Sequence, residues 1–201
     1  MRCAIAFLIA LAPLAGQAAE TKVVIDNAWA RATRVVLAPH EKLPARDYDE
    51  SVVVYLSDTA SRKDGDTAHF DAGRRAEDNS TDHPVEEVIV ELKPNAPGFP
   101  PHSVVRDPVK LAPAYHSVDF ENARVRVLRT VLDPHIKSPL HDHPSYVVVY
   151  LTELHTTMAI KDGKTIDNVR HKGDVAWRDA LSHVTENIGA RRAKEIQIEL
   201  K

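Results

Sequence analysis

The sequence predicts an all-β protein built from two related antiparallel units in tandem. Three observations lead to this prediction: one stretch of the chain occurs twice, the apolar segments are short and rich in β-branched residues, and no long amphipathic helix can be recognised. With 201 residues, of which 43% are hydrophobic and 27% charged, the chain is long enough for one large or two small domains and apolar enough to bury a core.

The internal repeat emerges when residues 27–56 are moved forward by 95 positions, because 16 of the 30 residues are then identical without a gap. The run Val52–Leu56 recurs as Val147–Leu151 in this alignment. A second block, from Gly65 to Lys93, matches at an offset of 108, so the second copy is longer by 13 residues. We expect both copies to share one fold and to pack on each other, because neither is large enough to be comfortably stable alone.

The predicted strands are short, and their patterns differ. Val52–Leu56 and its twin are apolar without alternation, which predicts strands covered on both faces. Glu87–Lys93 and Glu195–Lys201 alternate charged with apolar residues, which predicts one wet face. An Asp-Gly pair follows Met158–Ile160 and is typical of a tight hairpin turn. The expected strands are Val23–Ile25, Val52–Leu56, Val88–Leu92, Val125–Leu132, Val147–Leu151, Met158–Ile160 and Ile196–Leu200.

A proline-rich segment lies between the two copies. Residues 94–114 contain six of the thirteen prolines, and proline cannot donate a hydrogen bond to the interior of a sheet. We therefore predict an extended linker over residues 94–114, which separates the first copy at residues 22–93 from the second copy at residues 115–201.

Residues 1–19 have the composition of a secretory signal peptide. Arg2 precedes an apolar run, and small residues follow around Gly16–Ala19. The run is shorter than the roughly 20 apolar residues that span a membrane. We expect cleavage at the end of the leader and a periplasmic or secreted protein. Because Cys3 lies inside the leader, the mature chain would contain no disulfide.

The charge pattern excludes two classes of partner. The formal net charge is −3 at pH 7 and no long basic run is present, whereas nucleic acids and anionic membranes require concentrated Lys and Arg. We therefore expect a small-molecule ligand or substrate and neither nucleic acid nor a membrane, with a homodimer left open.

Three histidines of the second copy have the spacing of metal ligands. His141 and His143 are two residues apart just before a predicted strand, so an extended chain directs both imidazoles to one face. His183 follows after a turn at Gly173 and is expected on a later antiparallel strand. Three imidazoles suit Zn, Cu, Fe or Ni and leave coordination sites open. In the first copy the corresponding positions hold Arg46, Tyr48 and Arg75, so we expect chemistry only in the second copy.

These residues resemble the two motifs of the cupin superfamily. His141-Asp142-His143 matches the His-x-His core of the first motif, and His183 with Asn187 matches the His-x-x-x-Asn of the second. The resemblance implies small antiparallel β-barrels of jelly-roll type, two in tandem as in a bicupin, with the first copy degenerate. It also implies that His141, His143 and His183 bind a divalent transition metal such as Zn, Fe, Mn, Ni or Cu.

The sequence departs from the cupin motifs at several positions. The glutamate of the first motif falls on Val147 or Val148, so its usual carboxylate ligand is missing. A three-histidine site remains chemically reasonable, and Glu153 or Glu186 could supply a carboxylate from elsewhere in the chain. The proline-x-glycine turn of the second motif is replaced by Asp179-Ala180-Leu181. We therefore expect weaker metal binding than in a complete cupin.

Two functions follow from these patterns. The first is an exported cupin-like protein with a three-histidine divalent-metal site in the second unit, with the sequence leaving open whether the site is catalytic. The alternative is a metal-free cupin that binds a small ligand or has a structural role. Asn187 and His135 are interpreted as structural, because Asn79 and His40 occupy the same positions in the copy without the histidine set.

Overall fold

The computed structural model describes residues 19–99, 103–161 and 163–201. The predicted leader therefore lies outside the described residues, except for Ala19. The first copy contributes the strands β1 (Glu20–Asp26), β2 (Ala30–Leu37), β3 (Arg46–Tyr48), β4 (Ser51–Tyr55), β5 (Thr67–Phe70), β6 (Gly73–Arg75) and β7 (Val85–Leu92). A short helix, α1 (Pro108–Leu111), follows. The second copy contributes β8 (His116–Glu121), β9 (Val125–Leu132), β10 (His141–His143), β11 (Tyr146–Tyr150), β12 (Leu154–Ile160), β13 (Thr165–Arg170), β14 (Val175–Arg178), β15 (Leu181–Asn187) and β16 (Ala193–Leu200).

The protein is all-β with antiparallel sheets, as the sequence predicted. The first copy forms a five-stranded sheet of order β1-β2-β7-β4-β5, and the second copy forms one of order β8-β9-β16-β11-β14. These orders correspond strand for strand under the repeat alignment. The register corresponds as well, because Val53 pairs with Ile89 in the first sheet and Val148 pairs with Gln197 in the second.

The additional residues of the second copy form a hairpin. Gly65 and Gly173 have φ angles of +88° and +85°, which marks them as equivalent turns and places the insertion before Gly173. The inserted strands β12 and β13 pair antiparallel around a turn at Gly163. They extend the smaller sheet, which is β3-β6 in the first copy and β10-β15-β12-β13 in the second. The histidine-bearing strands β10 and β15 therefore lie in the smaller sheet of the second copy.

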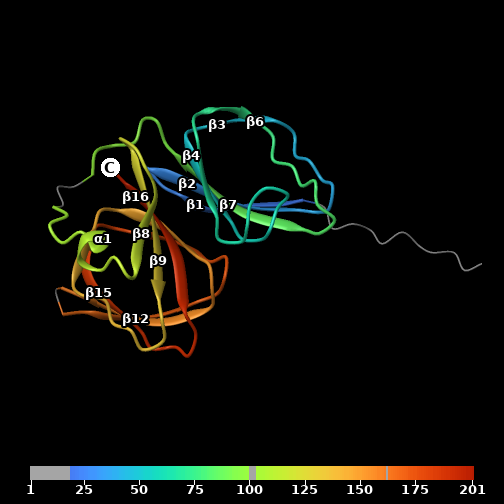
Figure 1. The fold of residues 1–201 in the computed structure, drawn as a ribbon. Coiled ribbons are helices and arrows are strands. Elements are labelled where there is room, and N and C mark those ends of the chain that lie inside the picture. Colours follow the sequence, from blue (N-terminus) through green and yellow to red (C-terminus); the bar gives the residue numbers. More distant parts are fainter. Residues whose placement is uncertain (1–18, 100–102, 162) are drawn as a thin grey trace, which may run out of the picture.

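The largest apolar cluster lies between the two copies. Val52 and Val54 belong to it, whereas Val53, on the opposite face of β4, packs in a separate cluster inside the first copy. In β11, Val147 and Val149 belong to the shared cluster, whereas Val148 packs in a separate cluster inside the second copy. The VVVYL runs are thus apolar on both faces because one face packs between the sheets and the other inside each copy. Figure 1 shows β2, β4 and β7 beside β9 and β16. The shared cluster contains Ala30, Ala32, Val52, Val54, Leu56, Val88, Val90, Leu92, Val125, Val127, Val147, Val149, Leu151, Ile196, Ile198 and Leu200.

Part of the segment between the copies packs on strand β10. The backbone N–H groups of Val105 and Arg106 donate to Asp142 Oδ2 at 3.1 and 2.7 Å, and the backbone N–H of Asp142 donates to Arg106 O at 2.9 Å. The Asp107 side chain then caps the first turn of α1. These contacts hold the end of the segment beside the histidine-bearing strand.

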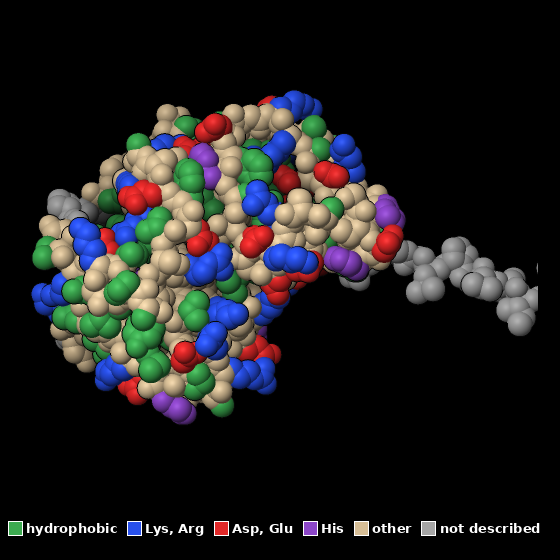
Figure 2. Space-filling view, viewed as in Figure 1, with side chains coloured by type: hydrophobic (Ala, Val, Ile, Leu, Met, Phe, Trp, Pro, Cys, Tyr) green, Lys and Arg blue, Asp and Glu red, His purple; other side chains and the backbone are tan. Residues whose placement is uncertain are grey.

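The surface carries charges of both signs. On the face shown in Figure 2, Lys and Arg side chains are interspersed with Asp and Glu. Among the described residues, no helix has the length and apolar character needed to cross a bilayer.

Candidate metal centre

The three predicted histidines converge in the second copy. His141 and His183 are directly opposite each other in the β10–β15 pairing, and His143 lies two residues along β10 on the same face. One ring nitrogen of each lies within 4.8 Å of those of the other two, and all three side chains are buried. The i, i+2 spacing and the cross-strand register therefore bring together the residues that the sequence singled out.

In each of the three rings, Nδ1 forms a hydrogen bond with the protein, so Nε2 is the nitrogen left to bind a ligand. Nδ1 of His141 donates to the backbone carbonyl of Pro139 at 2.7 Å, and Nδ1 of His143 is 2.6 Å from Glu199 Oε1. Nδ1 of His183 is 3.1 Å from Thr185 Oγ1. The Nε2 atoms of His143 and His183 are buried and have no hydrogen-bond partner among the described residues. A buried unpaired nitrogen is costly, and a metal ion would satisfy it.

The ring spacing fits imidazoles that share one ion. The ring centroids lie 4.9 Å apart for His141 and His143, 4.5 Å for His141 and His183, and 5.2 Å for His143 and His183. Two rings bound through nitrogen at about 2.1 Å, with angles between right and tetrahedral, have centroids about 4.5 to 5.2 Å apart. The three residues thus fit a divalent metal.

Burial keeps these imidazoles neutral. It lowers the pKa of His141 and holds the pKa of His143 and of His183 well below the usual value, and the neighbouring imidazoles lower the pKa of the latter two further. Only neutral histidine can ligate a metal, so burial prepares the ligands.

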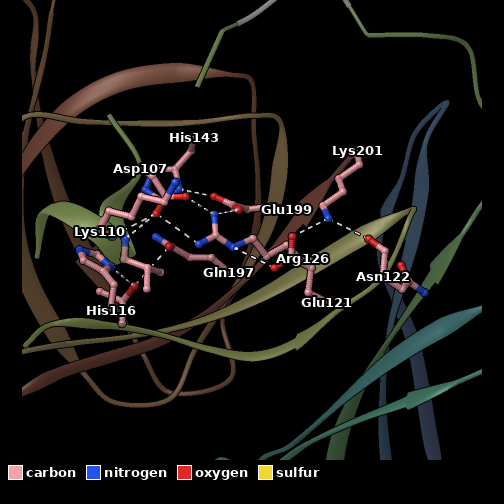
Figure 3. A network of polar contacts seen from close by, with 12 residues as sticks. Asp107, Lys110, His116, Glu121, Asn122, Arg126, His143, Gln197, Glu199 and Lys201 are labelled. Atoms are coloured by element: carbon pink, nitrogen blue, oxygen red, sulfur yellow. Dashed lines mark hydrogen bonds and ion pairs between the residues drawn. The ribbon is translucent and has the colours of Figure 1, made fainter. Parts of the chain in front are cut away.

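Glu199 contacts one of the three histidines, and the comparison with the cupin motifs did not identify it. Its carboxylate accepts the Nδ1–H of His143, and its other oxygen is 3.8 Å from the Arg126 guanidinium. Burial raises the pKa of Glu199 to about 7, while Arg126 opposes this effect. Arg126 in turn forms two hydrogen bonds with Asp107, the N-cap of α1 (Figure 3). This chain of contacts orients His143 and supplies negative charge near the three rings.

The carboxylates considered from the sequence lie elsewhere. Glu153 forms a surface ion pair with Arg191 at 3.3 Å, and Glu186 pairs with Lys137 at 3.4 Å. The interpretation that either would complete the site is wrong, because both side chains are substantially exposed.

Asp142 faces away from the three rings, as the strand alternation predicted. It accepts hydrogen bonds from Ser182 and Arg106, which hold its pKa well below the usual range although burial opposes this. Asp142 therefore fastens β10 to β15 and to the preceding segment from behind the site.

The structural interpretation of Asn187 is confirmed by its contacts. Nδ2 of Asn187 donates to the carbonyls of Leu132 and Arg191, and Nδ2 of Asn79 donates to the equivalent carbonyls of Leu37 and His83. Both asparagines thus hold the end of a strand in the same way. His40 and His135 are likewise equivalent backbone positions, with φ angles of +59° and +63°.

In the first copy the equivalent region is filled by arginines. Arg46 pairs in register with Arg75, as His141 pairs with His183. Their guanidinium carbons lie 3.5 and 3.7 Å from the centroid of the Tyr48 ring. Arg46 also forms a two-pronged ion pair with Glu91, the counterpart of Glu199. Two guanidinium groups thus occupy the region that corresponds to the three imidazoles.

A fourth histidine, His116, lies next to the three. Its ring centroid is 5.1 Å from that of His141, and the residue is 3% exposed. Its Nε2 is buried and has no hydrogen-bond partner within the described ranges. Burial lowers the pKa of His116 to about 3, helped by His141 and His143. No ligand spacing in the sequence identifies this residue.

A small cavity adjoins the site inside the second copy. Its volume of about 20 Å³ is enough for one water molecule. His183 and Thr185 line it on one side, and Tyr150, Arg178 and Glu195 are among the residues that complete the wall. Among the described residues Arg178 has no ion-pair partner, and its hydrogen bonds to Tyr150 Oη and Asn168 Oδ1 are long, at 3.4 Å each.

Comparison with known proteins shows the class to which this fold belongs. No protein-family model and no curated protein sequence matches the chain. Among solved structures, AerE from Microcystis aeruginosa matches with a TM-score of 0.68 and 14% identity, over 96% of this chain and 95% of AerE. A variant of oxalate decarboxylase from Bacillus subtilis matches with a TM-score of 0.62 and 14% identity, over 90% of this chain and 72% of the enzyme.

A variant of salicylate 1,2-dioxygenase from Pseudoaminobacter salicylatoxidans matches with a TM-score of 0.58 and 11% identity, over 86% of this chain and 71% of the enzyme. At these identities the likeness concerns the fold. The chain has the fold of the cupin superfamily, as the histidine motifs indicated.

Proposed function

We propose that this chain is an exported cupin-fold protein that binds one divalent transition metal through His141, His143 and His183. The observation that supports this most directly is the convergence of three buried imidazoles whose Nδ1 atoms have protein partners. Nε2 of His143 and of His183 has no hydrogen-bond partner in the part of the chain that the structure describes. A bound divalent ion would act as a Lewis acid toward an oxygen atom of a ligand. The ligands of the ion would be positioned by Pro139, Glu199 and Thr185.

We further propose a small carboxylate as the ligand. Arg178 lines the cavity beside His183 and forms no ion pair within the described residues, so its guanidinium could pair with a ligand anion. Because the cavity of about 20 Å³ holds one water molecule, a small carboxylate would bind there only if side chains of the cavity wall move aside. Two of the structural neighbours are named for oxalate and salicylate, which are small carboxylates. Glu195 faces the same cavity and burial raises its pKa to about 7, so the cavity also contains a group that exchanges a proton near neutral pH.

The metal proposal is tested by elemental analysis of protein purified without a histidine tag and dialysed against zinc or cobalt. About one equivalent of metal is expected, and the double variant His141→Ala/His143→Ala should lose it. Arg46→Ala, which changes the equivalent position of the first copy, serves as the control and should keep the metal. No metal in the wild type after reconstitution would favour the metal-free alternative, a small-ligand-binding or structural cupin.

The carboxylate proposal is tested by calorimetric titration of the metal-loaded protein with oxalate and with formate. Arg178→Gln should weaken binding of at least one anion by about 10-fold or more, since it removes a charge-assisted hydrogen bond. Arg178→Lys should retain part of the affinity. Equal affinities in wild type and Arg178→Gln would refute the assignment.

Export is tested separately, by mass spectrometry of the protein recovered from its native host. A mature chain that begins at Ala19 or Glu20 is expected from the leader pattern. Recovery of a chain that retains Met1 would argue against export.

A further inference from the structure

We propose that a cleft between the two copies is a second ligand site, which binds a small aromatic carboxylate. The cleft has a volume of about 320 Å³, which is within the size range of small-molecule sites. It lies where β5 of the first copy meets β8 of the second, since Thr67 donates to Asp119 Oδ2 at 3.1 Å there. No residue that lines this cleft also lines the cavity beside His183, so the inference does not depend on the proposed metal.

The cleft has an apolar floor and aromatic walls. Val52 and Val127 line it, and both belong to the buried cluster that the two copies share. Phe70 and Phe120 line it as well, and Phe120 stacks on the ring of His69 at a centroid distance of 4.2 Å. These surfaces fit the flat apolar body of an organic ligand and would be a poor site for a hydrated inorganic ion.

The opposite edge of the shared core shows what can fill such a space. There, Trp177 of β14 stacks on Trp29 at 5.5 Å, and Trp29 stacks on Phe99 at 5.2 Å. In the repeat alignment His69 occupies the position of Trp177, and Arg124 occupies the position of Trp29. The protein thus fills one edge with its own aromatic rings, whereas a cleft remains among the described residues at the other edge. A ligand ring would take the corresponding place.

The charges around the cleft leave one cation without a carboxylate. Asp119 accepts a hydrogen bond from Arg129 at 2.6 Å, and Glu50 accepts one from Arg124 at 2.7 Å, so each acidic group has an arginine of its own. Arg62 lines the cleft and forms no ion pair among the described residues. The net charge at the cleft is therefore positive, which favours a ligand with a carboxylate.

His69 supplies a second contact for this carboxylate. Burial opposes ionisation of Glu50, but the hydrogen bonds that Glu50 accepts from His69 and two further donors outweigh it and lower the pKa of Glu50. An ionised carboxylate only accepts, so the hydrogen lies on Nε2 of His69, 2.9 Å from Glu50 Oε1. Nδ1 of His69 has no hydrogen-bond partner in the part of the chain that the structure describes. When Nδ1 takes up a proton from solvent, the imidazolium bridges Glu50 and the ligand carboxylate.

The test is a titration of the full-length protein, without added metal, with benzoate. Nuclear magnetic resonance of the histidine ring nitrogens and of the phenylalanine amides follows the binding. Saturable shifts are expected at His69 and Phe120, with the ring nitrogens of His69 moving toward the signals of imidazolium. The signals of His183 should stay in place. Benzamide, a neutral probe of the same shape, should bind about 5-fold more weakly or less tightly still, since it cannot form an ion pair.

Three variants distinguish the contacts. Arg62→Gln should weaken benzoate binding by about 3- to 5-fold, which is the upper range for an ion pair with an exposed arginine. His69→Trp, which introduces the residue found at Trp177, should abolish binding because the larger ring fills the cleft. Lys63→Gln is the matched control and should leave the affinity unchanged, because Lys63 is exposed, pairs with Asp58 and does not line the cleft.

The wild-type spectra decide the matter even if His69→Trp fails to fold. No saturable shift at His69, or shifts at His183 alone, would overturn the assignment of the cleft. Equal affinities for benzoate and benzamide, or equal benzoate affinities in wild type and Arg62→Gln, would overturn the assignment of a carboxylate ligand. Loss of the metal site would change none of these readouts, so the proposed function and this inference can fail separately.

Discussion

Glu199 and Glu91 occupy the same position of the repeat but hold different partners. Glu199 accepts the Nδ1–H of His143, whereas Glu91 pairs with the guanidinium of Arg46. The same buried strand position thus holds a glutamate in both copies, which contacts a neutral imidazole in the second copy and a guanidinium in the first. At the scale of single residues, the two copies differ in the partner of this glutamate: the first copy has a guanidinium, and the second copy has a neutral imidazole beside which the proposed metal would supply the positive charge.

This contrast predicts the effects of two matched substitutions. Glu199→Gln should weaken metal binding by about 10- to 100-fold, because it removes the charge that orients and polarises His143. Glu91→Gln should leave metal affinity unchanged, although it breaks a partly buried ion pair. Chelator competition measures both. Equal losses of affinity in the two variants would show that the effect comes from the fold as a whole and not from the contact with His143.

The burial of His116 predicts a change of stability with pH. Burial lowers its pKa from 6.5 to about 3, so the unfolded chain takes up a proton that the folded chain refuses. The stability contributed by the neutral ring is therefore fully present above pH 6.5 and is lost as pH falls toward 3. In metal-free protein, the free energy of unfolding of the wild type should fall relative to His116→Gln by roughly 1 kcal/mol per pH unit below 6.5.

Urea unfolding of both proteins in the presence of a chelator, at several pH values between 5 and 7, measures this difference. Parallel stability curves for wild type and His116→Gln would contradict the burial of a neutral His116. Burial raises the pKa values of Glu195 and Glu199 to about 7, so these two groups stabilise the folded state as the pH falls. Because both proteins contain Glu195 and Glu199, this opposite effect cancels in the comparison.

At the scale of elements, the pairing of β10 with β15 creates the site. Its register places His141 opposite His183, and the contacts of Asp142 with Ser182 and Arg106 hold β10 in place from the other face. The end of β15 is fixed by Asn187, which donates to two backbone carbonyls.

Asn187→Ala should therefore lower the free energy of unfolding by about 1–3 kcal/mol, because it leaves buried carbonyl groups without donors. Asn79→Ala should cost a similar amount in the first copy. The metal content of folded protein should not change in either variant. If Asn187→Ala lost its metal while its urea midpoint stayed at the wild-type value, Asn187 would be a ligand rather than a strand anchor.

The sequence predicted those parts of the site that local spacing determines. His141, His143 and His183 could be found because strand alternation and a known motif place them on one face. Glu199 and His116 could not be found in this way, because their contacts cross from one sheet to the other and depend on tertiary packing. A signal for Glu199 was present, since the glutamate is retained in both copies as Glu91 and Glu199. The prediction that the alternating charged residues of β7 and β16 form a wet face is wrong, because Glu91 and Glu199 are buried. His116 lies before the matched block, which begins at Asn122 in the second copy, so the alignment did not reach it.

At the scale of the whole molecule, the two copies share one core. The cluster between the larger sheets contains residues of both copies, and the side chains of Trp29 and Trp177 stack across them at 5.5 Å. Apolar residues on both faces of β4 and β11 predicted that these strands would be covered twice. The prediction that the two copies pack on each other is confirmed by this shared cluster. The sequence could not show which strand faces form the contact, because a strand buried on both faces has the same pattern whatever packs on it.

The shared core predicts a single unfolding transition. Ile198→Ala, a fully buried residue of this cluster, should cost about 2–5 kcal/mol and should lower the melting temperature of both copies together. Calorimetry should show one endotherm with a calorimetric enthalpy close to the van't Hoff value. The near-ultraviolet circular dichroism of the stacked tryptophans should disappear at the same temperature. Two separated transitions would mean that the copies unfold independently.

We predict that the second copy holds a metal, whereas the first copy holds arginines at the equivalent positions. The most direct measurement is an anomalous difference map from crystals of the tag-free protein grown with Zn²⁺ or Co²⁺. We predict one strong peak at about 2.0 to 2.2 Å from Nε2 of His141, His143 and His183, and none among Arg46, Tyr48 and Arg75. A map without a peak at the three histidines, or with the only ordered ion on surface residues, would contradict the claim.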